Sequence, residues 1–201
     1  MTNTIAPDSV QVRHSRSSGV SLIEITIVML VTMAVGSLAI PKVISIVREL
    51  RTAGDARNLN GAILLAKMRA AANFSRARVY VDLAANTYRV EWQQSGTTTW
   101  TAEGSDQYLA KGVSFGFGSL TSPPSNTQST LAQAPICAGT SNTACVIFNS
   151  RGIPIDSTAS PTGEDALYVT DGRSVTGVTV SATGLTHVWR SGSATARWIQ
   201  R

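Results

Sequence analysis

The chain has 201 residues, of which 43% are hydrophobic and 14% are charged, and its formal net charge is +5. This apolar content excludes disorder throughout, and the length favours one membrane or filament helix plus one soluble domain over two large domains. The positive charge permits an anionic partner without requiring one. Two cysteines, Cys137 and Cys145, and two histidines, His14 and His187, show no metal-ligand spacing. We therefore expect no metal, no cofactor and no catalytic residues.

A long apolar segment follows a polar N-terminus. Residues 1–19 are polar, and the run from Val20 to Ile40 holds a single ionisable residue, Glu24, before Pro41 closes it. At the rise of a helix this run spans roughly 30 Å, about one hydrocarbon core. The run is therefore long enough to cross a membrane.

Two ordinary explanations of this run leave features unexplained. A cleaved signal peptide would have a shorter apolar core with a small-residue cleavage site after it, and Ser37-Leu38-Ala39 fits that site poorly. A plain membrane anchor fits the length but gives no reason for Glu24. A carboxylate within the apolar layer costs at least a few kcal/mol unless it finds a partner, so it marks a functional site by default.

The start of the run supplies such a reason, because Gly19-Val20-Ser21-Leu22-Ile23-Glu24 resembles the prepilin cleavage motif of type IV pilins and type II secretion pseudopilins. The resemblance implies that a prepilin peptidase cuts between Gly19 and Val20 and that the new amino group of Val20 is N-methylated. It also implies that Glu24 is retained in the membrane segment, and Pro41 matches a proline common in that family. Val20 and Ser21 depart from the usual phenylalanine and threonine.

The same resemblance implies the location and the assembly of the protein. Residues 1–19 would be a cytoplasmic leader, and residues 20–41 would cross the bacterial inner membrane and later form the core of a filament. The cationic amine of Val20 would pair with Glu24 of a neighbouring copy and set the axial register, because a displaced subunit would leave a buried charge alone. The implied partners are the prepilin peptidase, other pilin or pseudopilin subunits, an inner-membrane assembly platform, and membrane lipid before assembly.

Helical periodicity continues over residues 42–73, so we expect one helix from about Val20 to Asn73 that bends near Pro41. Its second half is predicted to be amphipathic. The residues expected on the apolar face are Val43, Ile44, Val47, Leu50, Leu59, Ile63, Ala66 and Ala70.

Residues 74–201 have the period of strands and form the predicted periplasmic domain. A hairpin is expected from Arg78–Leu83 and Thr87–Trp92, and a second hairpin is expected to close through Ala182-Thr183-Gly184. The Ser-, Thr- and Pro-rich stretch 118–134 is predicted to be a long surface loop. The predicted class is α+β, with a long N-terminal helix packed on a mostly antiparallel sheet. Further strands are expected at Val113–Phe117, Cys145–Phe148, Ala166–Thr170, Val175–Ser181 and Leu185–Arg190.

This layout resembles the branch of minor subunits that includes FimT and the general-secretion-protein-H pseudopilins. The likeness lies in the helix end at Ala66–Asn73 followed directly by a hairpin, in the segment Val146–Gly152, and in the last hairpin near Gly184. It implies a minor pseudopilin or pilin of a type II secretion pseudopilus or a type IV pilus.

Cys137 and Cys145 bracket a loop of turn-forming residues. In an oxidising compartment a disulfide would close this loop and stabilise the fold by about 2–3 kcal/mol. Two free thiols are the alternative, because the sequence does not show the distance between the two Cα atoms. The neighbouring acids Glu164 and Asp165 are expected on the surface.

Arginines and tryptophans alternate near the C-terminus, where Arg190, Arg197 and Arg201 accompany Trp189 and Trp198. Such residues suit phosphate contact and base stacking, which makes a DNA-binding minor pilin the alternative function. The Gly-Arg-x-Arg motif of DNA-binding relatives is absent, because the matching position reads Gly184-Leu185-Thr186-His187. We therefore favour tryptophans that pack on the sheet. A membrane-anchored domain unconnected with filaments is the third hypothesis, and it predicts no processing at Gly19.

Overall fold

A computed structural model describes residues 19–192 and 195–201, so most of the expected leader lies outside the described residues. The chain forms two compact units, residues 1–43 and residues 44–201. One helix, α1 (Leu22–Ala72), runs through both and contains Pro41 without interruption. The predicted helix is therefore confirmed within two residues at its start and one at its end, while a bend at Pro41 stays a prediction.

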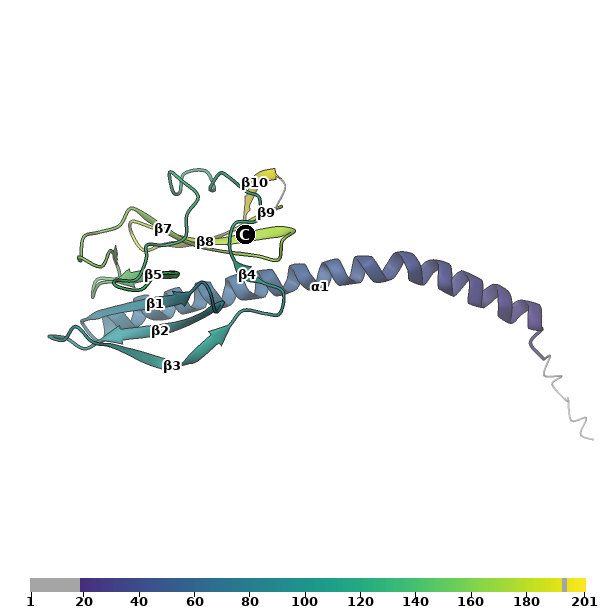
Figure 1. Ribbon diagram of the computed structural model, residues 1–201, viewed down its shortest axis with the longest axis horizontal. Helices are drawn as coiled ribbons and strands as arrows, with labels where there is room; N and C mark the ends of the chain where they lie inside the picture. The colour runs from purple at the N-terminus through teal and green to yellow at the C-terminus, as the bar shows by residue number, and fades with distance from the viewer. Residues whose placement is uncertain (1–18, 193–194) are drawn as a thin grey trace, which may run out of the picture. The chain divides into compact units, whose positions relative to one another are not determined.

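The larger unit holds two five-stranded sheets along the C-terminal half of α1 (Figure 1). Sheet A has the order β3-β2-β1-β5-β6 and sheet B the order β10-β9-β8-β7-β4, and every recorded strand pair is antiparallel. The α+β class is confirmed, with two sheets where we expected one. The strands are β1 (Arg76–Asp82), β2 (Thr87–Gln93), β3 (Trp100–Tyr108), β4 (Ser114–Phe115), β5 (Thr143–Phe148), β6 (Pro154–Ile155), β7 (Glu164–Thr170), β8 (Ser174–Ser181), β9 (Thr186–Gly192) and β10 (Thr195–Gln200).

Both predicted hairpins form. The first turns through Ala84–Asn86, where the carboxylate of Asp82 accepts hydrogen bonds from the amides of Ala84 (2.9 Å) and Ala85 (2.8 Å). Strands β3, β6 and β10 were not predicted, and the expected strand Val113–Phe117 is reduced to the two residues of β4. The stretch 118–134 contains no strand, as expected.

The core lies between α1 and the inner faces of both sheets. Of the residues predicted on the apolar face of α1, Leu59, Ile63, Ala66 and Ala70 are fully buried. Ile44, Val47 and Leu50, earlier in the same unit, are exposed. Packing on the domain begins only near Thr52. The core residues from the sheets include Val79, Val81, Val90, Val146, Phe148, Leu167, Val169, Val178 and Val180.

One lysine of α1 joins the helix to turns from both sheets. The amino group of Lys67 donates a hydrogen bond to the carbonyl of Gly184, in the β8–β9 turn, at 2.8 Å. The aliphatic part of Lys67 passes Gly152, in the β5–β6 turn, where a Cβ atom would lie 2.9 Å from Cε of Lys67. The two turns also meet directly, since a Cβ atom at Gly184 would lie 2.3 Å from the carbonyl oxygen of Gly152. Only glycine fits this junction.

The junction gives the first prediction. Gly184→Ala is expected to lower the free energy of unfolding by about 2–4 kcal/mol, because alanine at φ +74° is strained and its Cβ meets backbone that cannot move away. Gly96→Ala is the matched control, since Gly96 has φ +81° with open space around it, and it should cost about 1 kcal/mol. Denaturant unfolding of the full chain in detergent measures both. Equal losses would contradict the proposed close contact.

Candidate functional site

The bond between Gly19 and Val20 lies in exposed chain just before α1. Both residues are exposed, and among the described residues none beyond its chain neighbour comes within 4 Å of the position that a Cβ atom of Gly19 would occupy. The helix is started by Ser21, whose carbonyl accepts hydrogen bonds from the amides of Glu24 (3.0 Å) and Ile25 (3.2 Å). The predicted cleavage site therefore lies outside the helix.

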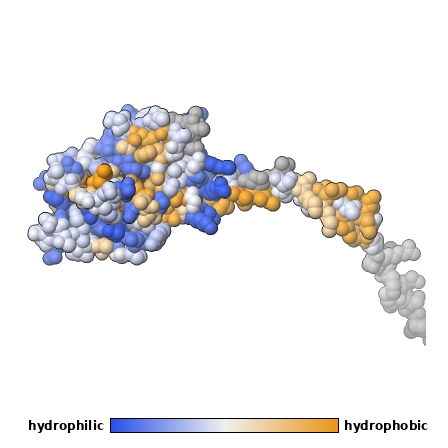
Figure 2. Space-filling view, viewed as in Figure 1, coloured by the Kyte–Doolittle hydropathy of each residue, from blue (hydrophilic) through white to orange (hydrophobic). Residues whose placement is uncertain are grey.

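Beyond this site the helix presents apolar side chains on all sides. Leu22, Leu30 and Met33 are between 68% and 81% exposed. Among the described residues, α1 is the one helix long and apolar enough to cross a membrane, and none of its apolar stretch is buried within the chain. Figure 2 shows this segment as a hydrophobic surface. It needs lipid or other protein around it.

The hydroxyl groups within this stretch are satisfied by the helix itself. Thr26 donates to the carbonyl of Ile23 (2.8 Å) and Ser37 to the carbonyl of Ala34 (2.8 Å). Thr32 donates to the preceding turn in the same way, at 2.9 Å. Such back-bonding lets a polar side chain remain in an apolar environment, where an unsatisfied group costs several kcal/mol.

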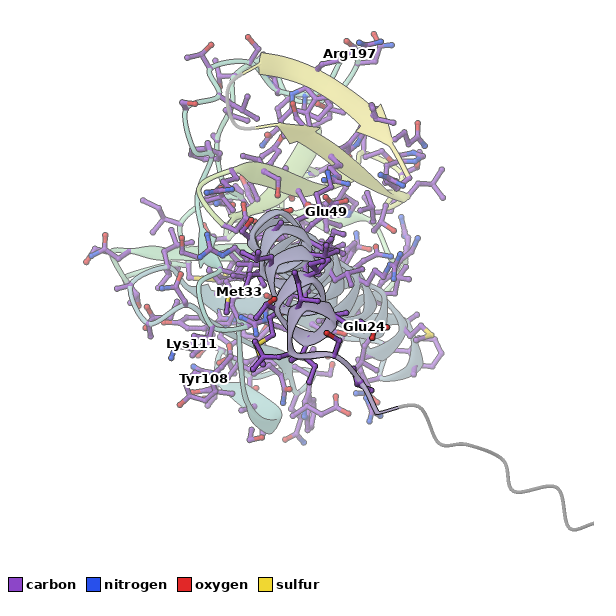
Figure 3. All side chains as sticks on the ribbon, turned by 90° about the vertical axis from the view of Figure 1, so that its right-hand side faces the viewer. Glu24, Met33, Glu49, Tyr108, Lys111 and Arg197 are labelled. Atoms are coloured by element: carbon purple, nitrogen blue, oxygen red, sulfur yellow. A yellow bond between two sulfur atoms is a disulfide. The ribbon has the colours of Figure 1, made fainter. Side chains whose placement is uncertain are left out.

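Glu24 lies in the first turn of α1 (Figure 3), and its carboxylate differs from these hydroxyls. Within the described residues no hydrogen bond or ion pair is recorded for it. The positive end of the helix dipole favours a carboxylate at this position, but only by about 0.3–1 kcal/mol near a surface. This falls short of what a carboxylate in the apolar layer needs. A cation from outside the helix could supply the difference.

The predicted disulfide is confirmed, since Cys137 and Cys145 are bonded with their Cα atoms 5.1 Å apart. The loop between them is further held by Thr143, whose hydroxyl accepts from the amide of Cys137 (3.2 Å) and donates to the carbonyl of Thr140 (2.6 Å). Both cysteines are buried beside Ile147 on the outer face of sheet A. The bond therefore fixes a loop onto the sheet.

The tryptophans of the C-terminal edge pack within the domain. The indole of Trp189 donates to the hydroxyl of Thr179 and that of Trp198 to the carbonyl of Ser122, both at 2.9 Å. The ring of Trp198 lies 5.7 Å from that of Tyr168, which is fully buried. Neither indole is arranged as a free stacking surface.

The arginines of this edge divide into two groups. Arg190 forms an ion pair with Glu49 of α1, and this bond lowers the pKa of the Glu49 carboxyl. Arg197 and Arg201 are exposed. DNA contact through these three arginines stays a prediction. Arg190 is already paired with Glu49 of its own chain.

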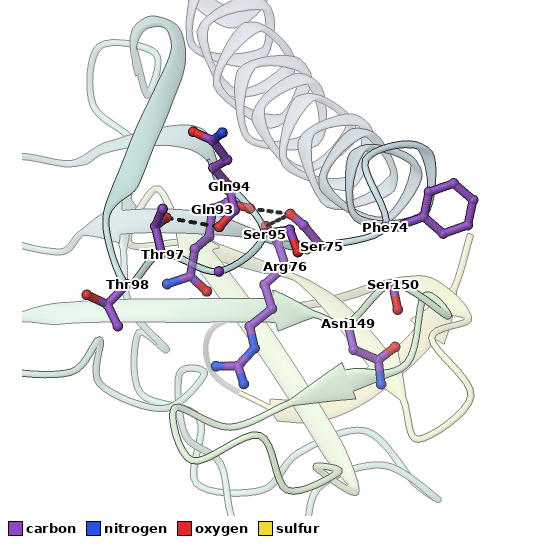
Figure 4. A pocket seen from close by; sticks show the side chains of 11 residues that line it. Phe74, Ser75, Arg76, Gln93, Gln94, Ser95, Thr97, Thr98, Asn149 and Ser150 are labelled. Atoms are coloured by element: carbon purple, nitrogen blue, oxygen red, sulfur yellow. Dashed lines mark hydrogen bonds between the residues drawn. The ribbon is translucent and has the colours of Figure 1, made fainter.

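One surface pocket of about 390 Å³ lies near the C-terminal end of α1 (Figure 4). Hydroxyl and amide side chains such as Ser75, Gln93 and Thr97 line it, together with Arg76. Two of them are bonded to nearby backbone, since Ser75 donates to the carbonyl of Gln93 and Thr97 to that of Gln94. In the described part of the chain no cluster of three metal-ligating side chains occurs.

The expectation that Asp165 lies on the surface is wrong. Glu164 is exposed, but Asp165 is 3% exposed in β7 and accepts a hydrogen bond from the hydroxyl of Thr162 at 2.9 Å. Burial raises the pKa of Asp165 from 3.8 to about 6, and the bond from Thr162 opposes the rise only in part. The alternation of β7 places this acid on the same face as Leu167 and Val169, and that signal was visible in the sequence.

This buried acid predicts a pH dependence of stability. Between the ordinary pKa of 3.8 and about 6, folded protein keeps a proton on Asp165 that the unfolded chain releases, so stability falls as the pH rises through this window. The loss is complete above the upper value and is on the order of 3 kcal/mol. Asp165→Asn should remove this pH-dependent loss of stability and leave the protein more stable than wild type near neutral pH.

Denaturant unfolding of the full chain at several pH values checks this prediction. Glu164→Gln, at the exposed neighbour, is the control and should follow the wild-type curve. Burial also raises the pKa of Asp55, so the difference between wild type and Asp165→Asn is the informative quantity. A difference that does not change with pH would contradict it.

Two solved structures are similar to this chain, and both are of the minor pseudopilin EpsH from the type II secretion system of Vibrio cholerae. One is 12% identical, and the match covers 69% of this chain and 95% of the solved chain with a TM-score of 0.45. The other is 11% identical, with 71% and 94% covered and a TM-score of 0.44. No protein-family model and no curated protein matches the sequence. Similarity this low does not assign a function, which has to come from the residues themselves.

Proposed function

We propose that this chain is a pilin-like subunit, cut after Gly19, held in the bacterial inner membrane by the first half of α1, and assembled through that helix into a filament. The filament is a type II secretion pseudopilus or a type IV pilus, and the subunit is a minor one of the general-secretion-protein-H or FimT kind. It acts as a structural component and as a substrate of the prepilin peptidase.

The observation that carries this proposal is the unpaired carboxylate of Glu24 on an otherwise self-satisfied apolar helix. Thr26, Thr32 and Ser37 bond to their own backbone, whereas Glu24 has no recorded partner in the described residues. Cleavage at Gly19 would create a cation at Val20, at the same end of the helix. One processing step would thus create the partner that the acid lacks.

Assembly would give the Glu24 carboxylate a cationic partner without exposing it to water. When apolar helices of several subunits pack together, the amine of one Val20 can meet Glu24 of a neighbour inside the bundle. A misplaced subunit would leave one charge buried and alone, which costs about 3–5 kcal/mol. The pair therefore selects one axial register, while the surrounding apolar side chains supply the packing.

The exposed apolar half of α1 supports both states of the subunit. Before assembly the stretch can lie in lipid with its hydroxyls satisfied internally. After assembly the same side chains can pack on their equivalents in other subunits. The domain would lie in the periplasm, where the disulfide between Cys137 and Cys145 persists.

Processing gives the first test. In cells that contain a prepilin peptidase, the intact mass of the protein should correspond to loss of residues 1–19 with one added methyl group on Val20. Gly19→Ala should leave the full-length chain. Gly36→Ala, in the helix with open space around it, is the control and should be processed like wild type. A native protein that keeps its Met1 would overturn the proposal.

The role of Glu24 gives the second test. Glu24→Gln keeps the size of the side chain and removes the charge, so cleavage should proceed while incorporation into filaments falls by at least about tenfold. Cross-linking of subunits in cells that supply the cognate machinery measures incorporation. Glu49→Gln changes another acid of α1 that already has a partner in Arg190, and it should assemble normally. Normal assembly of both variants would show that Glu24 does not set the register.

A further inference from the structure

A basic pocket of about 380 Å³ lies where α1 first meets the domain. Arg48 and Arg51 of α1 form one wall, and Lys111 and Gly112, in the loop between β3 and β4, form the other. Asp171 closes the pocket from the turn between β7 and β8. Two separate segments thus bring three cations around one hollow, and a third segment brings one acid, near the Lys111 labelled in Figure 3.

The loop that carries Lys111 is held in place by the helix. The guanidinium of Arg51 donates to the carbonyl of Lys111 at 3.4 Å, and the buried carboxylate of Asp55 accepts from the amide of Ala110 at 2.9 Å. A turn bond from the amide of Val113 to the carbonyl of Ala110, at 2.9 Å, completes the arrangement. The position of the Lys111 backbone is therefore set by the fold.

The charges of this pocket are not balanced by the acid beside them. Among the described residues, 19–192 and 195–201, no ion pair involves Arg48, Arg51 or Lys111. The carboxylate of Asp171 already accepts bonds from the amides of Arg173 (2.9 Å) and Ser174 (2.7 Å) in its own turn. Three cations face one acid, so the pocket favours an anion.

We propose that this pocket binds the phosphate of anionic phospholipid headgroups at the membrane surface. Along α1, Arg48 follows Ile40, the end of the apolar run, by only about 12 Å of helix. A headgroup layer is roughly 5–7 Å deep, and charges act over a further Debye length of about 8 Å. The pocket therefore lies within reach of the headgroups. This inference rests on the membrane anchoring in the proposed function, and it does not require filament assembly.

The apolar residues around the basic ones favour lipid over nucleic acid. Ile46, Val47 and Leu50 are exposed on the same stretch of α1 as Arg48 and Arg51. Basic side chains interleaved with exposed aliphatic ones suit the boundary between headgroups and acyl chains, where each kind finds its own medium. A surface made for DNA would instead be lined by polar and aromatic groups.

Photolabelling of the full chain in nanodiscs tests the proposal. The discs are made of phosphatidylcholine, and a small share of their lipid carries a photoreactive headgroup. This photoreactive lipid is phosphatidylglycerol in one sample and phosphatidylcholine in the other. Digestion with chymotrypsin keeps the peptides comparable between variants. We expect labels on the peptides with Arg48, Arg51 and Lys111 from phosphatidylglycerol, and several-fold fewer from phosphatidylcholine. The excess should shrink in high salt.

The triple variant Arg48→Gln, Arg51→Gln, Lys111→Gln should lose this several-fold excess, because each basic residue near the surface contributes to the attraction for anionic lipid. The control Arg76→Gln, Arg151→Gln, Arg197→Gln removes the same charge elsewhere on the domain and should keep it. Equal labelling by the two lipids, or an excess that survives in the triple variant, would overturn the inference.

Two further measurements separate this inference from neighbouring ones. Failure of the chain to stay in neutral nanodiscs would contradict membrane anchoring itself, and with it the proposed function. The second measurement is binding of a short DNA duplex to detergent-solubilised protein. If the wild type binds the duplex, the triple variant does not, and phosphatidylglycerol labelling shows no excess, the pocket is a nucleic-acid site and the lipid proposal is overturned.

Discussion

A single helix of this protein has to satisfy two different environments, and the rest of the structure follows from that constraint. The described large apolar side chains from Leu22 to Leu50 are between 40% and 81% exposed, whereas from Thr52 to Ala70 one face is buried against both sheets. The exposed half requires an apolar partner in lipid or in protein. The covered half is the part of the helix on which both sheets pack.

Lys67 and the two glycine turns show how the covered half is held. The hydrogen bond of Lys67 to Gly184 and its close passage at Gly152 bring α1, sheet A and sheet B to one point near the end of the helix. Arg51 and Asp55, near the start of the covered half, form hydrogen bonds to the β3–β4 loop. Apolar packing between these two sets of polar contacts supplies most of the adhesion, and the polar contacts fix where the sheets sit along the helix.

The sequence predicted those elements whose signal is local. The hydrophobic run, the helix to Asn73 and the hairpin Arg78–Trp92 each have their own periodicity, and they are found where expected. Strand β3 lacks such a signal because Gly104, Ser105 and Asp106 interrupt any alternation. It forms as an edge strand by pairing with β2. Strand β10 likewise depends on β9. Their formation is decided by neighbours distant in sequence, which no local window contains.

Burial along the apolar face of α1 could not be predicted from the sequence for a related reason. Periodicity shows that Ile44, Val47 and Leu50 share a face, but it does not show whether anything in the same chain covers that face. Burial of Asp165 was missed because two adjacent acids suggest a surface, although Leu167 and Val169 on the same face of β7 point inward. Glu24 stands out in the sequence because its nearest neighbours, Ile23 and Ile25, are apolar and it is the one ionisable residue between Val20 and Ile40.

In the proposed function, the placement of charge along α1 would link storage in the membrane to assembly. Glu24 would be the costly residue while the subunit lies in lipid, and it would gain its partner only when another subunit supplies an amine. The cations at Arg48, Arg51 and Lys111 would have the opposite dependence, because anionic headgroups would be available to them only at the membrane surface. A subunit that leaves the bilayer would therefore exchange headgroup contacts near the middle of α1 for an ion pair near its N-terminal end. Packing of the bare helices would have to supply the remaining difference, and the apolar side chains exposed on α1 in the single chain are available for that packing.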